Sequence, residues 1–274
     1  MANGVSALRL TPVNVTEKIK LGSKTASLEG PVDKTALEAA TKTVLARLYE
    51  LQEAFHADGR HALLLVLQGR DGSGKDSVIK TVYGAFNPTG VQVAAFGPPT
   101  PLELRHDFLW RVHNVVPPRG MVGVFNRSHY EDVLAVRVRE LVPASVWRAR
   151  YDHINTFERM LTDSGVIIRK CMLHVSREEQ QRRLKARLDD PRKNWKFRLE
   201  DLKDRAHWDA YTDAYRDMLE RCSTPWAPWY VVPSDDKAVR NHLIARMLVE
   251  TLEATKSTFP PMDEAVRAAA TGFA

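Results

Sequence analysis

A glycine-rich segment at residues 69–76 has the residue types and the spacing of a phosphate-binding loop. Its sequence, G-R-D-G-S-G-K-D, fits the pattern G-x-x-x-x-G-K. In such a loop the glycines let successive backbone N–H groups point at phosphate oxygens, and the lysine adds a positive charge. A strand-to-helix turn that binds nothing would also fit. We predict that phosphate is bound here by Gly69, Arg70, Gly72, Ser73, Gly74, Lys75 and Asp76.

Two acidic residues distinguish this loop from the usual pattern. Most such loops have Ser or Thr after the lysine as a ligand of Mg²⁺, whereas this chain has Asp76 followed by Ser77. Asp71 also places a carboxylate inside the loop, where it would repel bound phosphate unless a cation lay between them. We therefore expect Asp71 to help hold Mg²⁺, directly or through water. The alternative is an aspartate exposed in the turn.

A second group of charged residues follows an apolar segment at residues 120–125. Residues 125–132 have the sequence F-N-R-S-H-Y-E-D. Ligands and catalytic groups gather at the carboxyl ends of parallel strands, so Arg127 is expected to face the phosphates and neutralise the transferring group. These charges also fit the first turn of an ordinary helix. The predicted catalytic residues are Asp71, Lys75, Arg127, Glu131 and Asp132, and the predicted metal ligands are Asp71 and Asp132.

The third group is a basic segment, residues 177–198, with nine Lys and Arg against four Asp and Glu. It follows the fourth predicted strand, where nucleotide kinases have an Arg-rich lid that closes over the phosphates and excludes water. Arginine suits that role because its planar guanidinium grips phosphate oxygens in pairs. We therefore predict a helical lid at about residues 177–205, from which Arg183 and Arg187 bind phosphate. A solvated basic surface is the alternative.

Hydrophobic periodicity predicts the elements that position these groups. Apolar runs typical of strands covered on both faces occupy residues 61–68, 91–96, 120–125, 166–175 and 229–232. Helical patterns occupy residues 34–57 (capped by Asp33), 76–86, 102–112, 144–164, 177–188, 199–221 and 237–254. This alternation predicts a three-layer α/β/α fold with a five-stranded parallel sheet. We expect an extended arm at residues 1–30, one domain over 31–258 and a tail over 259–274.

The composition excludes several classes of protein. The 274 residues are 44% hydrophobic and 27% charged, which is ordinary for a globular protein. The longest apolar run, residues 62–67, is far too short to span a membrane, and the first twelve residues lack the layout of a secretory signal. Cys171 and Cys222 cannot build a disulfide framework or a four-ligand zinc site, so we expect a cytoplasmic protein without a membrane partner. The net charge of +6 favours an anionic partner.

Three motifs in order resemble the polyphosphate kinase 2 family over roughly residues 30–255. They are residues 69–75, F-N-R-S-H-Y-E-D-V-L at residues 125–134 and R-L-D-D-P-R-K-N-W-K at residues 187–196. The resemblance implies a thymidylate-kinase-like P-loop fold, the use of Mg²⁺, and phosphoryl transfer between inorganic polyphosphate and nucleotides. By position, Asp71 and Lys75 match the functional pair of the loop, and Arg127 matches the phosphate-contacting arginine. Arg187, Lys193 and Lys196 match phosphate-binding lid residues.

The second motif also resembles one branch of that family. Glu131 follows Tyr130, where members that prefer diphosphate acceptors tend to have Asn, and Asn126 precedes Arg127. This pattern resembles class III, which phosphorylates nucleoside mono- and diphosphates. The resemblance implies inorganic polyphosphate and adenine or guanine nucleotides as partners, with AMP and ADP converted to ADP and ATP.

Two other functions fit the same residues. An ATP-dependent nucleotide kinase of the thymidylate-kinase-like fold would use the same loop and lid with another donor. A basic protein that binds polyanions or nucleic acid would need no catalysis, although we expect no specific nucleic-acid partner. For the assembly we expect a homo-oligomer, a dimer or a tetramer, through the apolar helix at residues 34–57. A helix that packs in the core of the domain has the same pattern.

Overall fold

A five-stranded parallel sheet forms the centre of the computed structural model, which describes residues 4–270. The strands are β1 Ala62–Gln68, β2 Val91–Ala95, β3 Val122–Asn126, β4 Val166–His174 and β5 Trp229–Pro233. Their order across the sheet is β2-β3-β1-β4-β5. Each neighbouring pair is parallel. The predicted α/β fold with a five-stranded parallel sheet is therefore confirmed.

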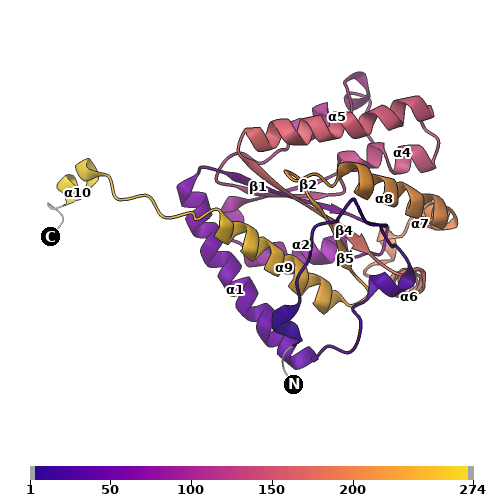
Figure 1. The fold of residues 1–274 in the computed structure, drawn as a ribbon, viewed down its shortest axis with the longest axis horizontal. Coiled ribbons are helices and arrows are strands. Elements are labelled where there is room, and N and C mark those ends of the chain that lie inside the picture. Colours follow the sequence, from indigo (N-terminus) through magenta and orange to yellow (C-terminus); the bar gives the residue numbers. More distant parts are fainter. Residues whose placement is uncertain (1–3, 271–274) are drawn as a thin grey trace.

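Helices cover both faces of this sheet (Figure 1). One face is covered by α1 Lys34–Asp58, α2 Lys75–Val82 and α9 Lys237–Ala254. The other face is covered by α4 Ala135–Val138, α5 Ala144–Asp163 and α8 Trp208–Cys222. The described chain also contains α3 Trp110–His113, α6 Arg177–Asp189, α7 Leu199–Ala206 and α10 Glu264–Ala270.

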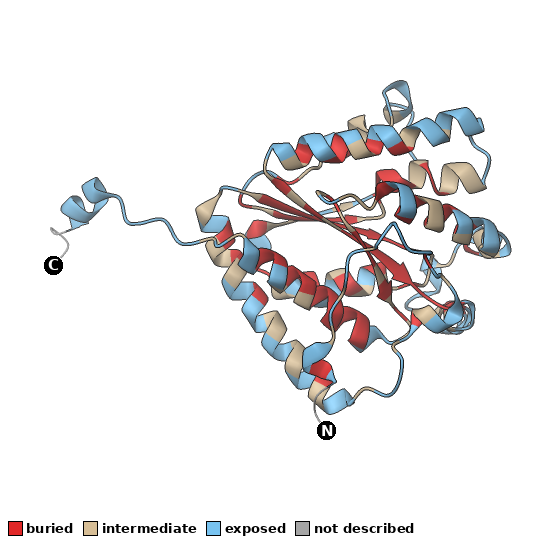
Figure 2. Ribbon diagram, viewed as in Figure 1, coloured by how far each residue is buried: buried red, intermediate tan, exposed pale blue. Residues whose placement is uncertain are grey.

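The central strand β1 contributes to both layers of the core. Leu63, Leu65 and Leu67 pack against α1, α2 and α9, whereas Leu64 and Val66 pack on the side of α5 and α8. Every residue of the strand is buried, as Figure 2 shows for the middle of the sheet. Successive side chains of a strand point to opposite faces. Burial on both faces therefore explains why the strand is a continuous apolar run.

Two helices have the ends that their sequences predict. The Asp33 side chain accepts a hydrogen bond from the Ala36 N–H at 3.1 Å, which caps the start of α1. Gly59 ends α1 in the left-handed conformation, with φ 65°. The last long helix, α9, has the predicted bounds, and the Asp236 side chain caps it. These ends depend on local signals that the sequence carries.

Two other helix predictions are wrong in their extent. Residues 102–112 form a 3-10 turn, Glu103–Arg105, and the short α3. The Asp107 side chain accepts a hydrogen bond from the Leu109 N–H at 2.9 Å, so the chain turns between them. Residues 199–221 are divided at His207 into α7 and α8. Just after this division, the Trp208 carbonyl accepts a hydrogen bond from Arg70 Nη2 at 2.8 Å.

The chain before α1 follows the edge of the sheet. Residues 4–33 contain two 3-10 turns, Val5–Ala7 and Ser23–Ala26, and the Val13 N–H donates to the Trp229 carbonyl of β5 at 2.8 Å. At the other end, α10 is exposed and stands away from the body (Figure 2). Residues 1–3 of the predicted arm and 271–274 of the predicted tail lie outside the described residues. Within the described chain, none of the helices is both long and apolar enough to cross a membrane.

One ion pair lies inside the fold, beneath the end of β3. Lys170 of β4 donates to Glu158 of α5 at 2.5 Å, to the Tyr130 hydroxyl at 2.7 Å and to the Cys222 carbonyl at 2.7 Å. Both charged side chains are at most 1% exposed. Burial alone would raise the pKa of Glu158, but Lys170 and His129 lower it. The pair therefore ties the segment after β3 to α5 and β4.

We predict that Lys170→Met lowers the free energy of unfolding by about 3–5 kcal/mol, because it leaves the Glu158 carboxylate buried without its partner. Lys170→Met combined with Glu158→Leu removes both charges and should recover most of that loss. Urea unfolding followed by circular dichroism measures both variants. Wild-type stability in Lys170→Met alone would contradict this account of the pair.

Candidate active site

The predicted phosphate loop lies at the carboxyl end of β1, between that strand and α2. Gly69, Gly72 and Gly74 have φ values of 150°, 83° and 101°, which favour glycine. A Cβ on Gly74 would collide with the Arg240 guanidinium. The Ser73 hydroxyl is buried and has no hydrogen-bond partner among the described residues. The loop therefore has a glycine-dependent shape and one polar atom that a phosphate oxygen would satisfy.

Lys75, the first residue of α2, turns its side chain back onto the loop. Its Nζ donates to the Gly69 carbonyl at 2.6 Å and to the Arg70 carbonyl at 3.3 Å. Burial and the positive charge of Arg127 lower the pKa of Lys75 to about 8, although Asp71 acts in the opposite direction. A bound anion would raise this pKa again, because it favours the charged form of the lysine.

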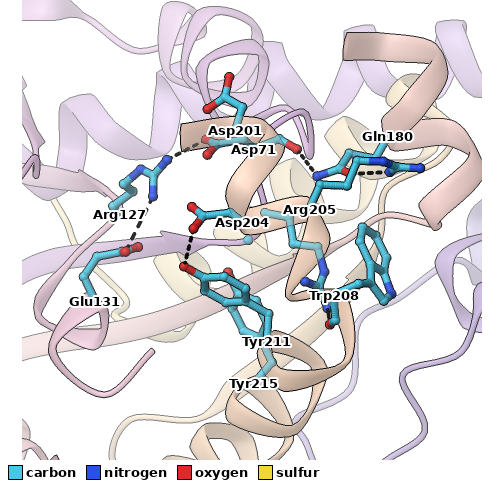
Figure 3. Close-up of a pocket in the computed structure, with 12 residues that line it drawn as sticks. Asp71, Arg127, Glu131, Gln180, Asp201, Asp204, Arg205, Trp208, Tyr211 and Tyr215 are labelled. Carbon is cyan, nitrogen blue, oxygen red and sulfur yellow. Dashed lines mark hydrogen bonds and ion pairs between the residues drawn. The ribbon is translucent and has the colours of Figure 1, made fainter. Parts of the chain in front are cut away.

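Arg127 stands between two carboxylates at the end of β3 (Figure 3). Its Nη2 donates to Asp71 Oδ1 at 2.5 Å, and its Nη1 lies 3.5 Å from Glu131 Oε2. Burial alone would lower the pKa of Arg127, but the negative charges of Glu131 and Asp71 outweigh burial and raise it. The residue has φ 63°, a left-handed conformation that costs a non-glycine residue about 1–2 kcal/mol. A strained arginine therefore joins two of the predicted catalytic acids.

Asp201 of α7 lies close to Asp71, a contact that was not predicted from the sequence. The two carboxyl groups are close enough to share a hydrogen bond, and Figure 3 shows them side by side. Burial and the charge of Asp71 raise the pKa of Asp201. Burial would also raise the pKa of Asp71, but Lys75 and Arg127 lower it. The only local signal of Asp201 is that of a helix start, since it accepts a hydrogen bond from the Arg198 N–H at 3.3 Å.

These residues line a small hollow beside the loop, here called the loop chamber (Figure 3). Its walls come from the loop, the segment after β3, α6, α7 and α8. The Arg70 guanidinium lies 3.8 Å from the centre of the Trp208 ring, so Arg70 faces α8. None of the lining residues after Glu131 was predicted from the sequence as a site residue. The chamber is lined by Gly69, Arg70, Asp71, Arg127, Glu131, Gln180, Asp201, Asp204, Arg205, Trp208, Tyr211 and Tyr215.

Asp132 lies in a different group from Asp71, the other predicted metal ligand. Its carboxylate is 3.0 Å from Arg150 Nη1 and 3.8 Å from Arg111 Nη2. Burial raises the pKa of Asp132 in spite of both arginines. Nowhere in residues 4–270 do three or more His, Cys, Asp or Glu side chains form a group that could hold a metal ion. The metal role of Asp132 stays a prediction.

A second hollow lies at the carboxyl end of β2, next to this group. Arg111 borders it and donates to the Gly97 carbonyl at 2.9 Å. The same guanidinium lies 5.6 Å from the centre of the Phe96 ring. The hollow is lined by Ala94, Ala95, Phe96, Gly97, Pro98, Thr100, Glu103, Arg111 and Val115.

Asp76, which replaces the usual Ser or Thr of the loop, faces two other elements. It accepts a hydrogen bond from Asn126 Nδ2 at 2.9 Å. Lys196, in the 3-10 turn Asn194–Lys196, lies 3.4 Å from its carboxylate. The start of α2, the end of β3 and the predicted lid therefore meet at this carboxylate.

The other basic residues of the predicted lid have separate partners. Arg187 lies 3.6 Å from Asp201 and so reaches the edge of the loop chamber. Lys193 pairs with Asp190 at 2.7 Å, within its own turn. Arg183 donates to backbone carbonyls of the phosphate loop at 3.0 and 3.2 Å. Direct phosphate contacts by these three residues stay a prediction.

The chain is similar to proteins of known family. The family model described as Polyphosphate kinase 2 matches residues 31–260. The AMP/ADP-polyphosphate phosphotransferase of Meiothermus ruber is 50% identical over 242 residues, which cover 86% of this chain and 91% of that protein. The ADP-polyphosphate phosphotransferase of Rhodopseudomonas palustris is 44% identical over 238 residues, 82% of each chain. The crystal structure of polyphosphate kinase 2 from Arthrobacter aurescens has a TM-score of 0.84 and 43% identity, and the match covers 89% of this chain and 88% of that one.

We predict that the loop binds tripolyphosphate less tightly as the pH rises above about 8. Burial and Arg127 lower the pKa of Lys75 to about 8, so its charge is present below that pH and lost above it. Each further pH unit should weaken binding about tenfold. Isothermal titration calorimetry from about pH 7 to about pH 9.5 measures the effect. Lys75→Met should bind weakly at every pH, and a flat profile for the wild type would contradict this pKa.

Proposed function

This chain belongs to the polyphosphate kinase 2 family, and from that premise we propose that it transfers phosphoryl groups between inorganic polyphosphate and nucleoside mono- and diphosphates. It is a polyphosphate:nucleotide phosphotransferase, for which AMP and ADP are the acceptors we favour. The observation that carries the proposal is Arg127, held between Asp71 and Glu131 beside a phosphate loop. An ATP-dependent nucleotide kinase has less support, because the named relatives use polyphosphate.

The phosphate loop is the proposed site of the polyphosphate end. The loop amides, the Lys75 ammonium and the N-terminus of α2 supply positive charge to it, and the Ser73 hydroxyl gains a phosphate oxygen as partner. Polyphosphate carries about one negative charge per phosphate, so it suits a row of basic groups. Each such contact is weak, and added salt weakens it further. Arg187, Lys193 and Lys196 are the proposed lid residues of that row.

Transfer requires positioning and charge neutralisation more than covalent help from the protein. The bond between the terminal phosphorus and its bridging oxygen breaks, and its electron pair stays on the shortened chain. A new bond forms to an oxygen of the acceptor's last phosphate. That oxygen is already anionic, so the step needs no general base. Arg127 is the proposed cation beside the transferring group, and Glu131 orients its guanidinium.

Kinases of this family generally use a divalent metal, and we propose Mg²⁺. Asp71 and Asp201 fit this ion, because Mg²⁺ commonly binds one or two carboxylates together with substrate phosphates and water. Burial is the largest cause of the raised pKa of Asp201, and the negative charge of Asp71 is the next. A cation between the two carboxylates would relieve their repulsion. When bound, the metal would neutralise charge on the phosphate oxygens.

The hollow at the end of β2 is the proposed site of the acceptor nucleoside. Phe96 offers an aromatic side chain, and the Arg111 guanidinium beside it links this hollow to Asp132. Both hollows lie at the carboxyl edge of the sheet, where ligands of open α/β sheets bind. The cytoplasmic location and the homo-oligomer stay predictions.

We predict that Lys75→Ala and Asp71→Asn each lower transfer about a hundredfold or more, because each removes a charge that neutralises or orders the phosphates. The assay supplies protein, Mg²⁺, long-chain polyphosphate and either AMP or ADP, without ATP, and measures the nucleotide formed. Lys42→Ala, which changes an exposed lysine of α1, is the control and should keep wild-type activity. Nucleotide formation no faster than in a boiled sample would exclude polyphosphate as the donor.

We also predict that Asp201→Asn raises the Mg²⁺ concentration needed for half-maximal activity about tenfold, because one of two carboxylates near the phosphates is lost. Glu200→Gln removes the same charge from the neighbouring, exposed residue of α7 and is the matched control. Titration of Mg²⁺ at saturating substrates measures both variants. The same Mg²⁺ requirement in both would count against Asp201 as a metal ligand.

A further inference from the structure

Side chains from two helices hold the carbonyl groups of the phosphate loop. We call Gln180 and Arg183 of α6 and Arg240 of α9 the loop brace. All three donate hydrogen bonds to loop carbonyls. The bonds run from Gln180 to the Asp71 carbonyl at 2.8 Å, from Arg183 to the Gly72 and Ser73 carbonyls at 3.0 and 3.2 Å, and from Arg240 to the Ser73 carbonyl at 3.1 Å.

Peptide geometry connects these bonds to the amide N–H groups of the loop. A trans peptide group is planar, so its N–H points away from its C=O. The hydrogen bond to the Asp71 carbonyl therefore directs the N–H of the same peptide group, that of Gly72, to the opposite side. The hydrogen bonds to the Ser73 carbonyl direct the Gly74 N–H in the same way. The Ser73 N–H itself is bound within the loop, to the Arg70 carbonyl at 3.1 Å. The brace thus fixes the direction of two amides of the cradle.

Arg240 is fully buried, and no acid forms an ion pair with it among the described residues. Its other donors reach Asn241 Oδ1 at 2.8 and 3.1 Å and Ser77 Oγ at 3.0 Å. Burial and the charge of Arg183 lower the pKa of Arg240 to about 10. Asp236 favours the charged form of Arg240 but forms no ion pair with it among the described residues, and a buried cation without an ion-pair partner costs stability. Packing alone therefore does not account for an arginine at this position.

Arg183 extends the brace to the segment between β5 and α9. Its Nη2 donates to the Ser234 and Asp235 carbonyls at 2.6 and 2.8 Å. Its Nε donates to Glu179 Oε1 at 2.7 Å. One guanidinium therefore joins the loop, α6 and the start of α9.

We propose that Gln180, Arg183 and Arg240 are positioning residues that hold the loop amides toward the phosphate chain before it binds. The inference rests on the proposed role of the loop as the polyphosphate site. Because the brace donates to the carbonyl side of the loop, it acts on the substrate through the backbone. Its two guanidinium groups also place positive charge behind the loop, which attracts an anion in front of it.

The test compares Arg240→Met and Arg240→Lys with the wild type. Met fills the space without a donor, whereas Lys keeps one cationic donor for the Ser73 carbonyl. Binding of tripolyphosphate is measured by calorimetry without acceptor, and thermal unfolding is measured in parallel. We expect Arg240→Met to bind tripolyphosphate about tenfold more weakly while its melting temperature stays near that of the wild type, and Arg240→Lys to recover most of the affinity.

Arg246→Met is the matched control. Arg246 lies on the same helix and donates to the Ser6 carbonyl at 2.6 Å, outside the loop, so its replacement should leave the affinity unchanged. Equal affinity of Arg240→Met and wild type would overturn the inference, as would an equal loss in Arg246→Met. If Arg240→Met does not fold, Gln180→Met tests the brace from α6, and wild-type affinity there would overturn it too. A wild type that binds no tripolyphosphate would instead remove the proposed function.

Discussion

A loop that directs its backbone N–H groups at one anion turns its carbonyl oxygens the other way, and where those oxygens are buried they need hydrogen-bond donors. The strand order of this sheet supplies those donors. Because β4 and β5 follow β1 across the sheet, α6 and α9 begin beside the loop that leaves β1. Gln180 and Arg183 lie in the first turns of α6, and Arg240 lies in the first turn of α9. The topology therefore decides which side chains can reach the loop.

The charges beside the loop are largely paired within the protein itself. Arg127 is shared by Asp71 and Glu131, and Arg187 lies near Asp201. This pairing limits the cost of burying charged groups before a substrate is present. A phosphate chain with its metal would bring both signs of charge, so each group can exchange a protein partner for a substrate partner. Arg127, whose backbone is strained, lies where such an exchange would occur.

Local signals in the sequence predicted the sheet, the loop and several helix ends. A buried strand followed by G-x-x-x-x-G-K needs no distant partner to be recognised, and neither does the Asp33 cap. The break between α7 and α8 could not be predicted, because it accompanies a bond from Arg70 to the Trp208 carbonyl, 138 residues away. In the sequence, Asp201 has only the features of an ordinary acid at a helix start. That it lies next to Asp71 follows only from the fold. The arginines of α6 predicted a phosphate-binding lid, but the carbonyls that Arg183 binds, 111 and 110 residues earlier, were not predictable.

The attachment of α6 to the loop has a mechanical consequence. Gln180 and Arg183 fasten the beginning of the helix, whereas the segment that includes Lys196 continues from its far end. A helix rises about 1.5 Å per residue, so the helix end at Asp189 lies about 9 Å along the axis beyond Arg183. The beginning of α6 is therefore an attachment point, and its far end carries the basic segment. Any rotation of the helix about this attachment would displace Lys196 farther than it displaces Gln180 or Arg183.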